Sequence, residues 1–256
     1  MPVVSFEAPK PMTLADIEAT QDDFVNAAVA ARLGGCDGVE LHGGNGYLFD
    51  QFLHSNINLR DDDYGGTIEK RCRFLLETVD KVSQAVGSGR LGVRLTPFGL
   101  FNQTLGTDRV RQWTYLCQEL GKRKLAYVHL IEPRFDEFKS ASEKALALGD
   151  LSAGNEMSLA PFREALGSTK VIVAGGYGPD NFSQGIESGA HDLVAFGRFF
   201  VSNPDLVERL RQELPLYKWD RSRFYGPFPD NEIGYTVHTK RELASSLDGL
   251  KPQLAD

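Results

Sequence analysis

Short apolar runs rich in β-branched residues alternate along this chain with helix-length amphipathic segments. This alternation is typical of a parallel sheet whose strands are joined by helical crossovers. Most of the runs are almost continuously hydrophobic, which favours strands that are buried on both faces. The runs predict five strands, at residues 38–41, 91–95, 127–131, 171–174 and 192–196.

The segments between these strands predict helices, the first of which is opened by a Thr13 cap with Asp16 nearby. The expected helices lie at residues 13–33, 68–86, 108–121, 159–166 and 180–188, and a last one at 204–217. We interpret residues 1–256 as a single domain with an N-terminal segment at 1–12. Residues 204–256 are expected to form a C-terminal helix, a covering loop and a tail.

Composition narrows the classes of partner and compartment. The net charge of −7 lacks the basic surplus that binding to a phosphate backbone requires, so we expect no nucleic-acid partner. Because no apolar stretch reaches about 18 residues and no leader is evident, we expect a cytoplasmic protein without a membrane partner. The three widely spaced cysteines include no CxxC pair, which argues against a disulfide framework and against a metal site.

Polar side chains follow the first strand on a glycine-rich turn, which contains His42, Asn45 and Tyr47. Reactive groups of parallel βα folds collect at the carboxyl ends of the strands. A histidine and an asparagine can together donate two hydrogen bonds to one substrate oxygen, and a tyrosine can deliver a proton. Each residue alone has an ordinary structural explanation, whereas their combination indicates a catalytic site.

The segment continues with Arg60-Asp61-Asp62-Asp63-Tyr64-Gly65-Gly66-Thr67 and with Arg71-Cys72-Arg73-Phe74. Together with the preceding turn it resembles the old yellow enzymes, FMN-dependent ene-reductases built on a (β/α)8 barrel. The resemblance implies that His42 and Asn45 grip the carbonyl or nitro group of an activated alkene. It implies that Tyr47 protonates the α-carbon while reduced flavin, itself reduced by NAD(P)H, gives hydride to the β-carbon.

The same resemblance assigns residues to the cofactor and to the substrate. Arg94 would face the N1/C2 edge of the flavin, where a cation stabilises the anionic reduced ring. Backbone N–H groups at glycines and a guanidinium suit a phosphate dianion, and they follow the fourth and fifth strands, where barrels commonly bind phosphate. The implied phosphate residues are Gly175, Gly176, Gly197 and Arg198, and the implied substrate-cavity residues are Phe101 and Tyr225.

The resemblance covers residues 6–236 but matches only the later part of a family member, so we expect an N-terminally shortened, incomplete barrel with about five of its eight βα units. Five strands cannot close such a barrel, because closure links strand number, tilt and shear. The open edges predict a homo-oligomer, an exchanged segment or a separate polypeptide that covers them.

Two alternative functions stay open at this point. The first is a flavin-free enzyme that uses His42, Asn45 and Tyr47 for proton transfer, as in isomerisation, cyclisation or elimination, since enolate stabilisation needs no hydride carrier. The second is a non-catalytic partner subunit. The favoured interpretation is an oxidoreductase that reduces the activated C=C bond of an α,β-unsaturated carbonyl compound with FMN and NAD(P)H.

Overall fold

The computed structural model describes residues 7–133, 141–148, 157–226 and 228–235. Within them, five strands form one sheet in the order β1-β2-β3-β4-β5. The strands are β1 Val39–Gly43, β2 Leu91–Leu95, β3 Tyr127–Ile131, β4 Val171–Ala174 and β5 Leu193–Ala195. The pairs from β1 to β4 are parallel. All five expected strands are confirmed, although the first extends two residues further and the last is shorter.

The chain divides into two compact units, which are described separately here. Unit 1 comprises residues 1–176 and 185–193, and unit 2 comprises residues 177–184 and 194–256. Strands β1 to β4 therefore belong to unit 1, whereas β5 crosses the boundary at Leu193.

The main helices of unit 1 follow the expected pattern. They are α1 Leu14–Leu33, α3 Ile68–Val86, α4 Arg109–Gly121 and α6 Ala160–Leu166. Thr13 opens α1 with a capping box, in which its hydroxyl accepts from the Asp16 N–H at 3.1 Å while its own N–H donates to the Asp16 carboxylate at 2.8 Å. Gly87, at φ 91°, ends α3 in a conformation that favours glycine.

Other helices differ from the expectation. Two short helices that the sequence did not indicate are α2 Leu48–Leu53 and α5 Ala141–Leu148, and single 3-10 turns form η1 Ser88–Arg90 and η2 Phe101–Gln103. The prediction of a helix at 180–188 is wrong in extent, because only α7, Gln184–Glu187, is helical within that range.

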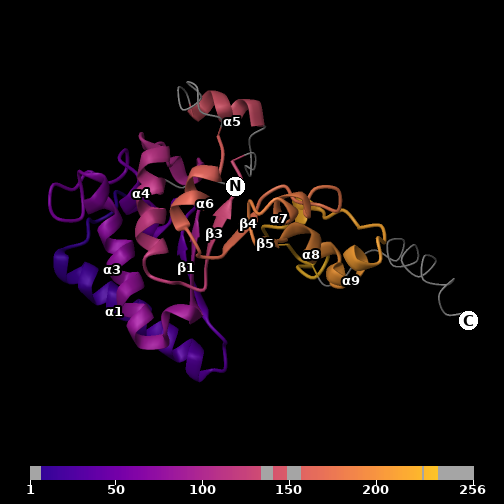
Figure 1. The fold of residues 1–256 in the computed structure, drawn as a ribbon, viewed down its shortest axis with the longest axis horizontal. Helices are drawn as coiled ribbons and strands as arrows, with labels where there is room; N and C mark the ends of the chain where they lie inside the picture. The colour runs from indigo at the N-terminus through magenta and orange to yellow at the C-terminus, as the bar shows by residue number, and fades with distance from the viewer. Residues whose placement is uncertain (1–6, 134–140, 149–156, 227, 236–256) are drawn as a thin grey trace, which may run out of the picture. The chain divides into compact units, whose positions relative to one another are not determined.

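The helices pack on one face of the sheet of unit 1. Helix α1 packs against α3, and α4 against α6; Figure 1 shows α1, α3 and α4 beside the strands. Gly121 permits the second contact, because a Cβ there would lie 3.0 Å from the Leu166 carbonyl oxygen. The strand residues that form the dry core are Leu41, Leu91, Val93, Leu95, Val128, Leu130, Val171 and Val173.

The opposite face of the sheet is polar and is open at β1, so the expectation of strands buried on both faces is wrong for β1, whereas β2 and β3 are buried at nearly every residue. On β1 the buried residues Leu41 and Gly43 alternate with Glu40 and His42, which are partly exposed. Arg94 on β2 is half-buried on the same face as His42. This alternation is the period-2 pattern of a strand with one face on the core.

Unit 2 contains the short helices α8 Arg198–Ser202 and α9 Leu206–Arg211 and the 3-10 turn η4 Arg221–Arg223. The helix expected at 204–217 ends at Arg211, since Glu213 adopts φ 55° and Pro215 follows. The stretch beyond it is held by Asn203, whose amide donates to the Tyr217 carbonyl at 2.9 Å and accepts from the Tyr217 N–H at 2.8 Å.

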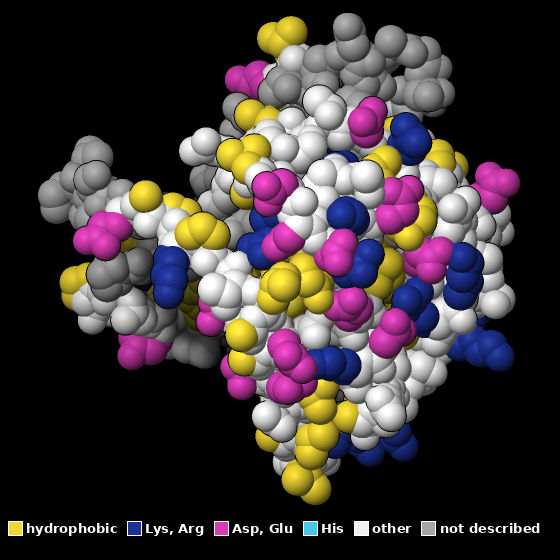
Figure 2. Space-filling view, turned by 90° about the vertical axis from the view of Figure 1, so that its left-hand side faces the viewer, with side chains coloured by type: hydrophobic (Ala, Val, Ile, Leu, Met, Phe, Trp, Pro, Cys, Tyr) yellow, Lys and Arg dark blue, Asp and Glu magenta, His cyan; other side chains and the backbone are white. Residues whose placement is uncertain are grey.

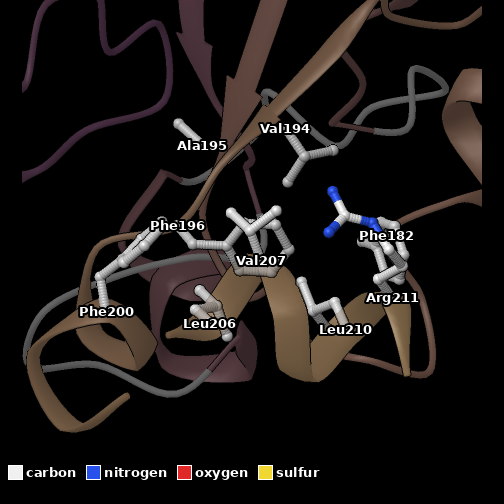
Figure 3. Close-up of a pocket in the computed structure, with 9 residues that line it drawn as sticks. All are labelled: Phe182, Val194, Ala195, Phe196, Phe200, Leu206, Val207, Leu210 and Arg211. Carbon is white, nitrogen blue, oxygen red and sulfur yellow. The ribbon is translucent and has the colours of Figure 1, made fainter. Parts of the chain in front are cut away.

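An apolar cleft of about 590 Å³ opens on unit 2 (Figure 3). Side chains of β5, α8 and α9 meet there, and the guanidinium of Arg211 stands at one side. The lining residues are Phe182, Val194, Ala195, Phe196, Phe200, Leu206, Val207, Leu210 and Arg211. The surface of β5 and of the two helices in this cleft is thus hydrophobic and accessible.

The surface in Figure 2 carries Lys and Arg side chains interspersed with Asp and Glu side chains. Ion pairs also join neighbouring segments: Lys81 of α3 lies 2.8 Å from Asp22 of α1, and Arg123, which follows α4, lies 2.7 Å from Asp80 of α3. Among the helices described, none is long and apolar enough to cross a lipid bilayer.

Candidate active site

His42, Arg94 and His129 form a row across β1, β2 and β3. His42 is the register partner of Arg94, and Arg94 is the register partner of His129. Since in-register residues of parallel strands project to the same face, the three side chains share the polar face of the sheet. The expected catalytic histidine and the expected flavin-facing arginine are therefore neighbours.

The turn after β1 has a backbone that few residues can adopt. Asn45 and Gly46 have φ values of 57° and 68°, and asparagine and glycine are the residues that adopt this region most readily. A Cβ on Gly46 would lie 2.5 Å from the Cβ of Asn102, and one on Gly44 would lie 2.7 Å from the Thr96 hydroxyl oxygen. The glycines thus let the loop after β2 pack directly onto this turn.

Hydrogen bonds hold the turn from three directions. The Asn45 N–H donates to the Thr96 hydroxyl at 2.8 Å, and the Gly46 N–H donates to the Asp50 carboxylate at 2.8 Å. The Asn102 amide donates to the Asn45 carbonyl at 3.0 Å. The backbone of Asn45 is therefore fixed by neighbours, and its side chain is left for another partner.

The three expected catalytic side chains are available to bind a ligand. Among the residues that the structure describes, the side chains of His42, Asn45 and Tyr47 have no hydrogen-bond partner. The Tyr47 ring is 51% exposed, and its centroid lies 5.5 Å from the His42 ring and 6.5 Å from the Phe101 ring. Polar groups that are positioned but unpaired are suited to bind a ligand.

The electrostatics favour a neutral His42. Burial and the positive charge of Arg94 hold the pKa of His42 below its usual value, although the charges of Asp50 and Glu40 oppose this. Near neutral pH the imidazole therefore has one N–H donor and one acceptor nitrogen. A neutral donor of this kind can bind a carbonyl oxygen.

Sequence reasoning missed the buried polar pair that supports this turn, Asp50 and His54. Both are almost fully buried, and the His54 Nε2 lies 3.4 Å from the Asp50 carboxylate. The His54 Nδ1 accepts the Gly106 N–H at 3.2 Å, and burial keeps the pKa of His54 below its usual value. The sequence feature that could have indicated this pair is its spacing of four residues, which places two side chains next to each other only in a helix such as α2.

Arg109 is a second buried group that sequence reasoning missed. It is 1% exposed and its guanidinium donates to the carbonyls of Pro97 at 2.9 Å, Gly99 at 3.0 Å and Thr104. Burial lowers the pKa of Arg109 to about 10, so the group remains charged at neutral pH. Arg109 thereby holds the loop that carries Phe101.

Features of unit 1 fit a bound flavin. The Arg94 Nε is buried and has no hydrogen-bond partner among the described residues, and a buried unpaired donor of this kind requires a partner such as a ligand or water. Gly175 and Gly176 follow β4 with φ values of 109° and 76°. Three of the expected residues belong to unit 2 instead. Gly197 is the N-cap of α8, the Arg198 guanidinium lies 4.7 Å from the Trp219 ring, and Tyr225 is 73% exposed.

The structure thus brings together five of the expected residues, all in unit 1: His42, Asn45, Tyr47, Arg94 and Phe101. The assignment of a phosphate site to Gly175, Gly176, Gly197 and Arg198 involves both units and stays a prediction. So does the role of Tyr225.

Comparison with known proteins identifies the family. The family model of the NADH:flavin oxidoreductase / NADH oxidase family matches residues 3–217. The chain belongs to this family. The resemblance to the old yellow enzymes is thereby confirmed, and with it the incomplete (β/α)8 barrel as the fold.

Individual members of this flavin oxidoreductase family are similar over most of the chain. Flavin oxidoreductase hxnT of Emericella nidulans is 44% identical over 89% of this chain and 60% of its own length. 12-Oxophytodienoate reductase 2 of Arabidopsis thaliana is 38% identical over 93% of this chain and 60% of its own. The solved structure of morphinone reductase superposes with a TM-score of 0.77 at 35% identity, over 91% of this chain and 58% of that one. The chain thus spans about 60% of the length of these relatives.

Proposed function

We propose that this chain is the part of an ene-reductase that holds FMN and the substrate, and that it reduces the C=C bond of an α,β-unsaturated carbonyl compound with NAD(P)H. The observation that carries this proposal is the placement of the unpaired His42 side chain beside Arg94, with the unpaired Asn45 side chain in the turn that follows His42. Membership of a flavin oxidoreductase family supports the cofactor. Relatives named as reductases of 12-oxophytodienoate and of morphinone support the substrate class.

The reaction divides between the cofactor and the residues of this chain. When bound, FMN supplies the hydride. His42 and Asn45 donate hydrogen bonds to the substrate carbonyl oxygen, which lowers the electron density at the β-carbon and stabilises the enolate oxygen. The Tyr47 hydroxyl gives its proton to the α-carbon, and Arg94 faces the flavin with its unpaired Nε–H.

The cofactor assignment is tested by titration of the purified protein with FMN, followed by flavin absorbance and fluorescence. We expect saturable binding, and we expect Arg198→Ala to weaken it roughly ten- to a hundredfold, because the variant loses a charge-assisted contact to phosphate. Arg111→Ala, which removes an exposed arginine of α4 outside the proposed site, is the control and should bind as wild type. An Arg198→Ala variant with unchanged affinity would refute the phosphate assignment.

A wild-type protein that binds no FMN would favour the flavin-free alternative. In that case His42, Asn45 and Tyr47 would serve proton transfer, since hydride transfer requires a carrier. The three side chains alone favour neither chemistry, so the titration decides between them.

We further propose that this protein assembles with a second chain, most simply a copy of itself, and that it works in the cytoplasm on small molecules. In the described part of the chain β1 is an edge strand of the sheet, and this edge and the apolar cleft of unit 2 support assembly, because soluble proteins rarely leave such surfaces uncovered. The net charge of −7 and the interspersed charges in Figure 2 support a small-molecule function over nucleic-acid binding.

Light scattering at micromolar concentration should give a mass above the 28.3 kDa of one chain. Leu210→Glu places a carboxylate in the apolar cleft and should shift the population toward monomer if the cleft is the interface. Glu208→Gln, a change outside the cleft lining on the same helix, is the control. A wild-type protein that remains monomeric would contradict the assembly proposal.

A further inference from the structure

Glu40 belongs to a polar cluster that the proposed reaction does not use. It precedes His42 by two residues on the same face of β1, and it is the register partner of Gly92, which in turn is the register partner of Tyr127. A Cβ on Gly92 would lie 2.4 Å from the Cε2 and Cζ atoms of Tyr127. The phenol of Tyr127 therefore lies across β2, above the glycine and directed toward β1.

Two side chains of β3 converge on the Glu40 carboxylate. The His129 Nδ1 lies 3.1 Å from the Glu40 Oε2, and the Tyr127 phenol, which lies over Gly92, interacts with the same carboxylate and lowers its pKa. Burial tends to raise the pKa of Glu40, but the hydrogen bonds from His129 and Tyr127 and the charge of Arg94 outweigh burial and lower it. Burial and the Glu40 charge raise the pKa of Tyr127 to about 12. At neutral pH the cluster thus contains an ionised carboxylate and a protonated phenol.

Arg94 lies in the middle of this cluster. It separates His42 from His129 in the register, and it is diagonal to Glu40 on the neighbouring strand. No carboxylate of the described residues forms an ion pair with it, and both its Nε and the His129 Nε2 are buried without a hydrogen-bond partner there. Glu40 therefore balances the charge of Arg94 from a distance rather than by contact.

We propose that Glu40, fixed by His129 and Tyr127, is a positioning residue that sets the electrostatic potential at Arg94 and His42. This inference rests on the proposed function in one respect, the presence of the flavin ring at Arg94. A carboxylate diagonal to a cation on the neighbouring strand reduces the positive potential around that cation. Glu40 thus limits how strongly Arg94 stabilises an anionic reduced flavin, and it supports the basicity of His42.

The test uses Glu40→Gln, which keeps the shape of the side chain and removes its charge. In the flavin-free protein, side-chain NMR titration should show a lower pKa for His42 than in wild type, because the Glu40 charge raises it. With FMN bound, reduced flavin should bind about tenfold more tightly relative to oxidised flavin, the scale of one partly screened charge. That change equals a shift of about 30 mV to more positive two-electron potential.

Two further variants make the result specific. Glu18→Gln removes an exposed carboxylate of α1 and should change neither quantity. Tyr127→Phe keeps the charge of Glu40 but removes one donor, so the carboxyl carbon of Glu40 should titrate at a higher pKa. This second variant tests the arrangement even if Glu40→Gln does not fold.

The outcomes separate this inference from the proposed function. A folded Glu40→Gln with the His42 pKa of wild type overturns the inference, and so does a Tyr127→Phe variant with an unchanged Glu40 titration. A wild-type protein that fails to bind FMN overturns the proposed function, whereas the NMR titrations need no flavin and still decide the role of Glu40.

Discussion

We expect His42→Ala and Asn45→Ala each to lower the turnover of an α,β-unsaturated ketone by about 10²–10³-fold, the usual loss when one donor of an oxyanion-type pair is removed. The physical reason is that the two side chains have no internal partner and lie three residues apart at the carboxyl end of β1, so we expect each to donate to the substrate oxygen. Steady-state kinetics with FMN-saturated protein measure the effect. Asn26→Ala, at an exposed position of α1, is the control for loss of an amide and should keep full turnover.

The Tyr47→Phe variant distinguishes the proposed proton donor, Tyr47, from His42 and Asn45, which we propose bind the substrate oxygen. The variant keeps the ring between His42 and Phe101 and loses only the hydroxyl, so protonation slows while a phenolic ligand still binds. By contrast, His42→Ala and Asn45→Ala should bind the phenol weakly. If Tyr47→Phe turns over at the wild-type rate and the other two bind phenol normally, these residues are structural.

Arg109→Leu should cost on the order of 4 kcal/mol in the free energy of unfolding, since each buried acceptor left unsatisfied costs about 1–3 kcal/mol. The carbonyls of Pro97 and Thr104 lose their donor in this variant, whereas the Gly99 carbonyl keeps the Thr104 hydroxyl at 3.0 Å. The loop that carries Phe101 then lacks its anchor, so we expect weaker phenol binding as well. Urea denaturation followed by circular dichroism measures the loss of stability.

Arg111→Leu is the matched control for this experiment. It makes the same substitution two residues away on α4, at an exposed position, and should leave the free energy of unfolding near that of wild type. An Arg109→Leu variant within about 1 kcal/mol of wild type would show that the buried guanidinium is not the anchor of the loop.

The fold was predictable where local signals are strong. The strands are apolar runs, Thr13 and Asp16 form the expected capping box, and Gly87 ends a helix at positive φ. Helix α2 was not predictable, because it has only six residues and no side-chain cap marks its start. It also directly follows the glycine-rich turn, whose polar residues indicate a site rather than a helix. The open polar face was also missed, since β1 alternates but the hydrophobic β2 and β3 suggested cover on both sides.

The candidate site was predictable where its residues are adjacent in the sequence. His42, Asn45 and Tyr47 lie in one turn, and Arg94 joins them because consecutive strands pair in register. The contact of Glu40 with His129 joins residues 89 positions apart and depends on the register of three strands, which no local pattern specifies. Arg109 lies in the helix predicted at 108–121, but the helical pattern does not indicate that its partners are loop carbonyls.

The close packing of the loop after β2 on the turn after β1 has a consequence for engineering. Gly46 leaves no space between the two segments, and the Asn102 amide binds the Asn45 carbonyl. Changes to the backbone near Phe101, which we propose lines the substrate cavity, should therefore also move Asn45, which we propose binds the substrate carbonyl. Side-chain changes at Phe101 that leave Asn102 intact should alter substrate scope without that movement, which makes Phe101 the better first target for directed evolution.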